Sequence, residues 1–259
     1  MLKGLYTAHS GMVNEQNRMD VLTNNLANAA TTGYKKEGST SRAFKDELAL
    51  RIKDNSEAPN IARRIGKMNL GVKIGENYTD YSQGSFRITD NACDMAISGQ
   101  GFFAVQFTNK AGVTSTKYTR DGSFTLNKEG YLVTKDGDFV LGADENPIQL
   151  NPALDFTVEQ DGTIWQGGEA VGKLRITDFV DYNYLEHYGE NYYQPVEGAE
   201  EQPADAKVYS GYLEASNVQV VSEMVQMIAV TRAYETNQKI IQTYDGSLEI
   251  AVNQLGKLQ

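Results

Sequence analysis

The chain has 259 residues, of which 40% are hydrophobic and 22% are charged, a composition typical of a folded protein that is long enough for one large domain or two. Its formal net charge of −10 argues against nucleic acid as a partner, because phosphate binding requires a basic surface. Its single cysteine, Cys93, excludes an internal disulfide, and the absence of a run of 18 apolar residues excludes a membrane-spanning helix.

Residues 2–29 are predicted to form a helix with one apolar stripe. Apolar residues recur every seven positions, with a further leucine on the same face, which is the pattern of a helix that packs along another helix. The stripe consists of Leu5, Met12, Met19, Leu26 and Leu22. Polar residues such as His9 and Glu15 interrupt any apolar core at this end, so we expect no cleavable signal peptide.

The end of this helix is rich in asparagine. Asn24, Asn25 and Asn28 lie within five residues, and their amides compete with the helix backbone unless they find other partners. We therefore expect them to bond to a neighbouring helix. Gly33 can adopt the left-handed conformation that ends a helix.

The next segment, residues 35–80, is polar and weakly periodic and is predicted to be an extended connector. Residues 35–76 include ten basic and six acidic residues. One short helix is predicted around residues 40–52.

Residues 81–213 change to a period of two, which predicts an antiparallel β domain. Short runs rich in aromatic and β-branched residues are separated by turn sequences such as Asp121-Gly122 and Asp136-Gly137. The predicted strands are residues 85–89, 102–107, 123–126, 131–134, 138–141, 163–165 and 173–179. A tyrosine-rich stretch over residues 182–193 leads into an acidic loop at residues 197–205.

Residues 216–258 are predicted to form one long helix with a second apolar stripe. Its members fall seven apart, with further residues at alternating spacings of three and four. They are Val220, Met227, Val230, Tyr234, Ile241, Tyr244 and Leu248. The back of this helix carries few charges, which indicates that it also meets protein. Gly246 is a predicted weak point.

These elements define an α+β fold with a discontinuous helical domain, residues 1–34 and 214–259, in which the terminal helices pair as a coiled coil. The connector, residues 35–80, and the inserted antiparallel β domain, residues 81–213, lie between them. The alternative is two amphipathic helices that cover an ordinary core.

Signs of chemistry are few. Only two histidines occur, His9 and His187, which argues against a histidine metal cluster or a catalytic triad. The Gly99-Gln100-Gly101 run fits a loose dinucleotide pattern, but a strand and not a helix follows it. We predict no enzyme, catalytic residue, cofactor or metal site. A carbohydrate-acting β enzyme would need two carboxylates facing across a cleft.

Four stretches of the sequence resemble motifs of a known family. Residues 24–35, Asn-Asn-Leu-Ala-Asn-Ala-Ala-Thr-Thr-Gly-Tyr-Lys, and residues 216–237 resemble the N- and C-terminal signatures of the bacterial flagellar axial proteins. Residues 94–103 and 118–124 are similar to the distal-rod and proximal-rod subgroup. The resemblance implies a structural rod subunit, distal rather than proximal, that assembles with its own copies into a helical tube, transmits torque and lines the export channel. Distal-rod and hook proteins carry extra residues that residues 48–75 could represent.

The resemblance also implies partners and a location. The partners are neighbouring rod and hook subunits and the flagellar export apparatus, and the location is the flagellar basal body. The residues predicted for the assembly interface are the two stripes together with Asn25, Asn28, Gly33 and Asn237. Phe44 and Leu48 resemble an export-gate motif, although an apolar pair on one helical turn explains their spacing equally well. The runner-up function is a surface coiled-coil or adhesin-like protein that forms a small closed oligomer.

Overall fold

The computed structural model describes residues 2–51, 63–109, 112–189 and 191–255. The chain forms two compact units. The first, here the helical unit, comprises Met1–Ala27, Glu37–Asp80 and Gln219–Gln259; the second, the β unit, comprises Asn28–Lys36 and Tyr81–Val218. Helices and antiparallel strands both occur, so the predicted α+β class is confirmed.

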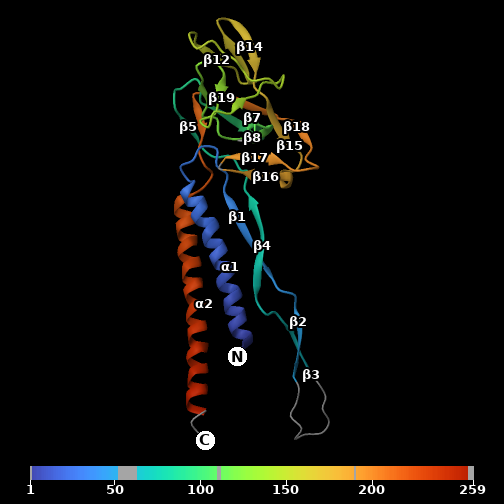
Figure 1. Cartoon of the computed structure of the whole chain (residues 1–259), viewed down its shortest axis with the longest axis vertical. Coiled ribbons are helices and arrows are strands. Elements are labelled where there is room, and N and C mark those ends of the chain that lie inside the picture. The colour runs from blue at the N-terminus through green and yellow to red at the C-terminus, as the bar shows by residue number, and fades with distance from the viewer. Residues whose placement is uncertain (1, 52–62, 110–111, 190, 256–259) are drawn as a thin grey trace. The chain divides into compact units, whose positions relative to one another are not determined.

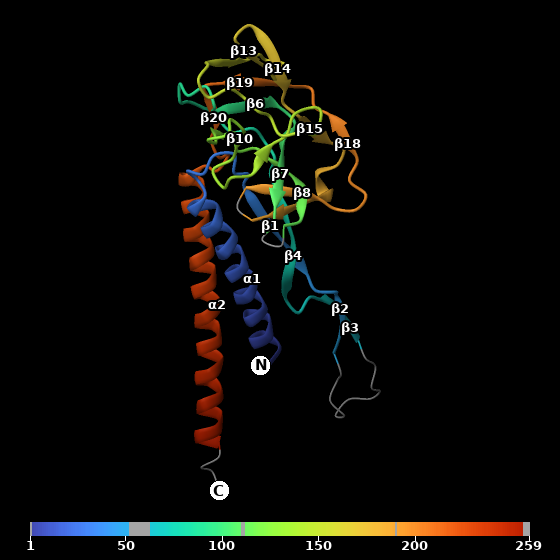
Figure 2. The same ribbon diagram turned by 45° about the horizontal axis from the view of Figure 1, so that its top comes forward.

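The helical unit contains two long helices, α1 (Leu2–Ala27) and α2 (Val220–Leu255). Figures 1 and 2 both show them side by side, and their contacts pair the start of α1 with the far part of α2. They therefore run in opposite directions. Gly246 does not interrupt α2, which continues through it to Leu255.

An antiparallel ribbon completes the helical unit. Strand β1 (Glu37–Ala43) pairs with β4 (Val72–Thr79), and β2 (Glu47–Arg51) pairs with β3 (Arg63–Met68). Both β1 and β4 contact α1 (Figure 1). The Thr7 hydroxyl donates to the Leu70 carbonyl at 2.9 Å, so the ribbon is attached to the helix beside it.

The short helix predicted around residues 40–52 is wrong for the described part of that range, and residue 52 lies outside the described residues. Residues 38–41 read Gly-Ser-Thr-Ser, and these residues favour non-helical backbone. Across the ribbon, the Thr40 hydroxyl donates to the Glu76 carbonyl and accepts from the Glu76 amide. These bonds stabilise the strand pair, which the weak periodicity of the segment did not indicate.

The β unit is built from short antiparallel strands. Its largest sheet has the order β16-β17-β8-β7-β11-β10-β9, and β15 pairs with both β7 and β18. Smaller sheets pair β12-β13-β14, β19-β6 and β20-β5. The strands and one 3-10 helix are β5 (Phe86–Ile88), β6 (Met95–Gly99), β7 (Phe102–Thr108), β8 (Thr114–Thr119), β9 (Thr125–Leu126), β10 (Leu132–Val133), β11 (Phe139–Val140), β12 (Phe156–Val158), β13 (Thr163–Gln166), β14 (Glu169–Lys173), β15 (Ile176–Phe179), η1 (Tyr182–Tyr184), β16 (Leu185–Tyr188), β17 (Tyr192–Pro195), β18 (Glu201–Pro203), β19 (Ala206–Ser210) and β20 (Tyr212–Glu214).

Strand β7 is buried on both faces. Because side chains alternate along a strand, Phe103 and Val105 enter one apolar cluster and Phe102 and Ala104 enter another. The first cluster also holds Phe124, whose ring meets Phe103 edge to face with centroids 5.1 Å apart. The β unit therefore has two cores with β7 between them.

Most predicted strands of this unit are confirmed: β5, β9, β10 and β11 are shorter than predicted, whereas β7 and β13 are each one residue longer. Residues 173–179 are an exception, since they hold the end of β14 and all of β15. The stretches predicted as tyrosine-rich and acidic loops contain β16, β17 and β18. Strands β16 and β18 consist largely of polar residues, and polar side chains suit strands with an exposed face. Strand β17 was missed although its Tyr193 is buried in the second apolar cluster.

Candidate functional site

The contact between α1 and α2 follows one antiparallel register. A Cβ atom added to Gly4 would collide with the ring of Tyr244, and one added to Gly11 would lie 3.0 Å from Asn237 Nδ2. Gly11 lies seven residues after Gly4 in α1, and Asn237 lies seven residues before Tyr244 in α2. Glycine lowers the stability of a helix interior by about 1 kcal/mol. Here it lets α1 approach the large side chains of α2.

The same register continues to a buried polar pair. Asn25 and Glu223 are both 0% exposed, and Asn25 Nδ2 donates to Glu223 Oε2 at 3.4 Å. Asn25 also donates to the Glu37 carbonyl at 2.7 Å and accepts from the Glu37 amide at 2.9 Å. This one side chain therefore links α1, α2 and β1.

The predicted stripe residues differ in how far the structure buries them. Val230 and Leu22 are buried, whereas Val220 is 42% exposed and Leu248 is 36% exposed. The half-buried members are Leu5, Met12, Met19, Leu26, Met227, Tyr234, Asn237, Ile241 and Tyr244. Sequence reasoning missed Glu223, although it lies seven residues before Val230 and so shares its position in the repeat.

The other predicted site residues lie elsewhere. Asn28 and Gly33 belong to the β unit, where Asn28 Oδ1 accepts from the Thr31 hydroxyl. Phe44 lies in the turn after β1 and is exposed, and Leu48 lies in β2. The two therefore do not share a helical turn, and that explanation of their spacing is wrong.

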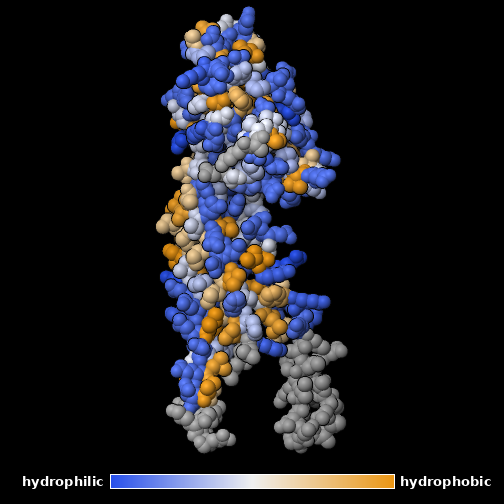
Figure 3. All heavy atoms as spheres, viewed as in Figure 1, coloured by the Kyte–Doolittle hydropathy of each residue, from blue (hydrophilic) through white to orange (hydrophobic). Residues whose placement is uncertain are grey.

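The back of α2 carries an exposed apolar stripe near the start of the helix. Its members are spaced by three and four residues, so they share one face, and their exposed fractions lie between 50% and 76%. They are Val221, Met224, Val225 and Ile228. Apolar side chains are also visible along the helices in Figure 3. We call these four residues the back stripe.

In the β unit, one buried carboxylate joins three passages of the chain. Glu214 is 1% exposed and its Oε1 lies 2.6 Å from Lys35 Nζ. The same oxygen accepts from the Gly84 amide at 2.9 Å, and Oε2 accepts from Arg120 at 3.3 Å. A buried charge requires such partners, so Glu214 fixes the incoming chain at Lys35 to the outgoing chain at β20.

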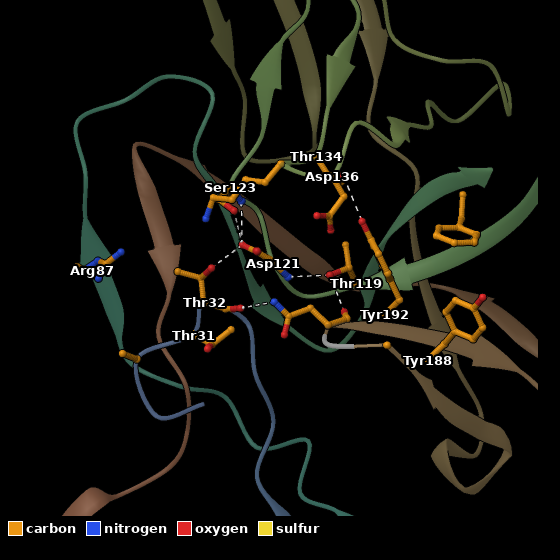
Figure 4. Close-up of a pocket in the computed structure, with 15 residues that line it drawn as sticks. Thr31, Thr32, Arg87, Thr119, Asp121, Ser123, Thr134, Asp136, Tyr188 and Tyr192 are labelled. Carbon is orange, nitrogen blue, oxygen red and sulfur yellow. Dashed lines mark hydrogen bonds between the residues drawn. The ribbon is translucent and has the colours of Figure 1, made fainter. Parts of the chain in front are cut away.

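A polar cleft of about 700 Å³ lies in the β unit (Figure 4). Asp121 Oδ1 accepts from the Thr32 hydroxyl at 2.7 Å and from the amide and hydroxyl of Ser123 at 3.0 and 2.7 Å. On another wall, the Tyr192 hydroxyl donates to Asp138 at 2.9 Å. These carboxylates are engaged in structural hydrogen bonds, and the first of them holds residues 31–33 in place.

The described residues contain no group of three His, Cys, Asp or Glu side chains that could hold a metal ion. Within the same part of the chain, neither helix is long and apolar enough to cross a membrane. The main features of the described residues are the packed helices, the buried Glu214 carboxylate with its partners and the exposed back stripe, which are packing and surface features.

Parts of the chain match known protein families. Residues 5–35 match the family described as flagella basal body rod protein, residues 96–166 match the flagellar hook protein FlgE/F/G D1 domain, and residues 209–255 match the flagellar basal body rod FlgEFG protein C-terminal family. The chain is 35% identical to the flagellar hook-basal body complex protein FlhO of Bacillus subtilis, with 100% of both chains covered.

Two further relatives are similar over nearly their whole length. The chain is 34% identical to the flagellar basal-body rod protein FlgG of Buchnera aphidicola, with 96% of this chain and 98% of the relative covered. It is also 34% identical to the flagellar basal-body rod protein FlgF of Caulobacter vibrioides, with 100% of both covered. The chain belongs to the flagellar basal-body rod protein family. It is a structural protein of the flagellum, which confirms the prediction that it is not an enzyme.

Proposed function

We propose that the chain is a distal-rod subunit whose terminal helices pair as a coiled coil and assemble with those of neighbouring copies into the inner wall of a helical tube. The β unit and the ribbon surround this wall and transmit torque, while the lumen serves as the export channel. Contacts between unlike surfaces of successive copies generate such a tube when they do not close into a ring.

The observation that carries this proposal is the back stripe. Burying each of its side chains stabilises a contact by about 1.5–3 kcal/mol, yet in the single chain all four are exposed. The contact with α1 occupies the opposite side of α2, where Val230 is buried. Each α2 therefore offers one face to α1 of its own chain and another to a further molecule.

The distal position is preferred to the proximal one because of the ribbon. Strands β2 and β3 extend the segment between β1 and β4, and the resemblance implies that distal-rod and hook proteins carry additional residues in this region. The relatives named FlgG and FlgF are each 34% identical to the chain, so sequence identity does not distinguish the two rod positions. The proposal therefore depends on the ribbon, and exchange of the chain for a proximal-rod protein of the same bacterium should not restore rod growth beyond the proximal segment.

For secretion, we propose that Phe44 and Leu48 engage the export apparatus before the chain folds. Phe44 is exposed and follows β1 directly. Replacement of both residues with serine should abolish secretion of the chain, while the purified variant should still fold.

Replacement of one back-stripe residue tests the assembly proposal. Val225→Asp should prevent rod completion and swimming, because burial of an unpaired carboxylate opposes the contact. Val171→Asp is a matched control, since Val171 is exposed in β14 of the β unit. Normal rods and swimming with Val225→Asp would contradict the proposal, and a small closed oligomer of the wild-type chain would support the adhesin-like alternative instead.

A further inference from the structure

A buried carboxylate lies in the otherwise weakly charged contact between α1 and α2. Glu223 shares the seven-residue repeat of Val230, Asn237 and Tyr244 on the face that meets α1. It is fully buried, and a carboxylate removed from water without donors destabilises a fold by several kcal/mol. An apolar residue at this position would add to the apolar contact with α1, so packing alone does not explain why a carboxylate is present.

Helix α1 supplies a matching donor. Asn25 Nδ2 donates both to Glu223 Oε2 and to the Glu37 carbonyl, and Asn25 Oδ1 accepts from the Glu37 amide. These bonds to β1 fix the orientation of the Asn25 amide, so that its N–H group is directed at the Glu223 carboxylate. The register set by Gly4 and Gly11 brings these two residues together.

A second copy of α2 would not offer this match. In a parallel, in-register pair of α2 helices, Glu223 would face Glu223, and two carboxylates in one buried layer repel each other. In an antiparallel pair centred on Asn237, Glu223 would face Ala251, which has no side-chain donor. Tyr244 would also lack the recess that Gly4 provides in α1.

We propose that Glu223 and Asn25 select the partner of α2: they direct its inner face to α1 of the same chain and exclude pairing with α2 of a second copy. A single polar residue in a helical repeat sets register and partner in this way while lowering stability. This inference rests on the contact between α1 and α2 and not on rod assembly. Its consequence is that the inner face of α2 is occupied within the chain, while the back stripe remains exposed to other copies.

The test is disulfide cross-linking of the full-length chain at a concentration at which the wild type sediments as a monomer. All variants carry Cys93→Ser and Val230→Cys, so that an interchain disulfide forms only where the inner faces of two α2 helices meet in a parallel, in-register pair. Glu223→Leu should increase the disulfide-linked dimer by about tenfold or more over the Glu223 parent, because it extends the apolar repeat. Glu249→Leu makes the same change at an exposed position and should leave the dimer at the parent level.

A second variant separates partner selection from simple loss of packing. Asn25→Leu removes the donor but keeps the carboxylate, so the dimer should stay near the parent level although α1 exchanges amide hydrogens faster. Equal cross-linking by Asn25→Leu and Glu223→Leu would overturn the proposal. So would a folded Glu223→Leu chain with no increase in dimer, because Glu223 would then act only as a favourable charge in the first turn of α2.

Discussion

Gly4 of α1 lies so close to Tyr244 of α2 that a β-carbon at position 4 would overlap the phenol ring. Gly11 meets Asn237 in the same way, one heptad further along both helices. Two glycines in a helix interior are unfavourable by propensity, and their position opposite large side chains explains them. The contact therefore depends on the pairing of small residues in α1 with large ones in α2.

Replacement of Gly4 with alanine should weaken the helical unit. Alanine raises helix propensity by about 1 kcal/mol, but its methyl group would displace Tyr244. Gly246→Ala is the matched control, because a Cβ atom there meets nothing within 4 Å. Thermal unfolding should show a lower midpoint for Gly4→Ala and a higher one for Gly246→Ala. Equal stabilisation by both changes would show that the close approach is unimportant.

Glu214→Gln should destabilise the β unit by about 3 kcal/mol, because it leaves Lys35 and Arg120 buried without their carboxylate. Glu145→Gln makes the same change in an exposed ion pair with Arg175 and should alter stability little. Urea unfolding followed by tryptophan fluorescence measures both. The role given to Glu214 is wrong if the two variants unfold at the same urea concentration.

The β unit should lose stability in alkaline solution. The pKa of Tyr118 is raised above its usual value, mainly by burial and also by its hydrogen bond to Glu201. The pKa of Tyr192 is raised mainly by burial and also by its hydrogen bond to Asp138. A raised folded-state pKa contributes stability that is complete below the unfolded value of about 10 and is lost as the pH rises further. Tyr118→Phe should flatten this decline above a pH of about 10, and parallel declines in variant and wild type would contradict the assignment.

Gly33→Ala should destabilise the β unit more than Gly189→Ala. Both glycines have a φ of 70°, so both substitutions carry the same backbone strain. A Cβ atom at Gly33 would collide with the backbone of Arg120 and Asp121, whereas one at Gly189 meets nothing within 4 Å. The difference in unfolding free energy between the two variants measures the close approach, and no difference would mean that residues 31–33 can move away from Asp121.

The two helices could be predicted from sequence because heptad spacing depends only on which residues recur along one element. Glu223 could not, since a charged residue is normally exposed and its burial depends on Asn25 far away in the chain. The ribbon was missed for a related reason: the pairing of Thr40 with Glu76 stabilises strands that have little local preference. The same holds for the Glu214 junction, whose members become neighbours only in the folded chain.

The members of the back stripe also could not be identified from the sequence alone. The sparse charge on α2 indicated that its back meets protein, but which residues remain exposed became evident only once Val221 and Val225 were placed opposite the face that contacts α1.

In the proposed assembly, the back stripe is buried between copies of this chain. The most direct measurement is sedimentation and electron microscopy of the purified full-length protein at rising concentration, with the wild type beside Val225→Asp and Val171→Asp. We expect the wild type and Val171→Asp to form filaments of increasing length while Val225→Asp remains monomeric and folded. Filaments of Val225→Asp that match those of the wild type in length and critical concentration would contradict the claim.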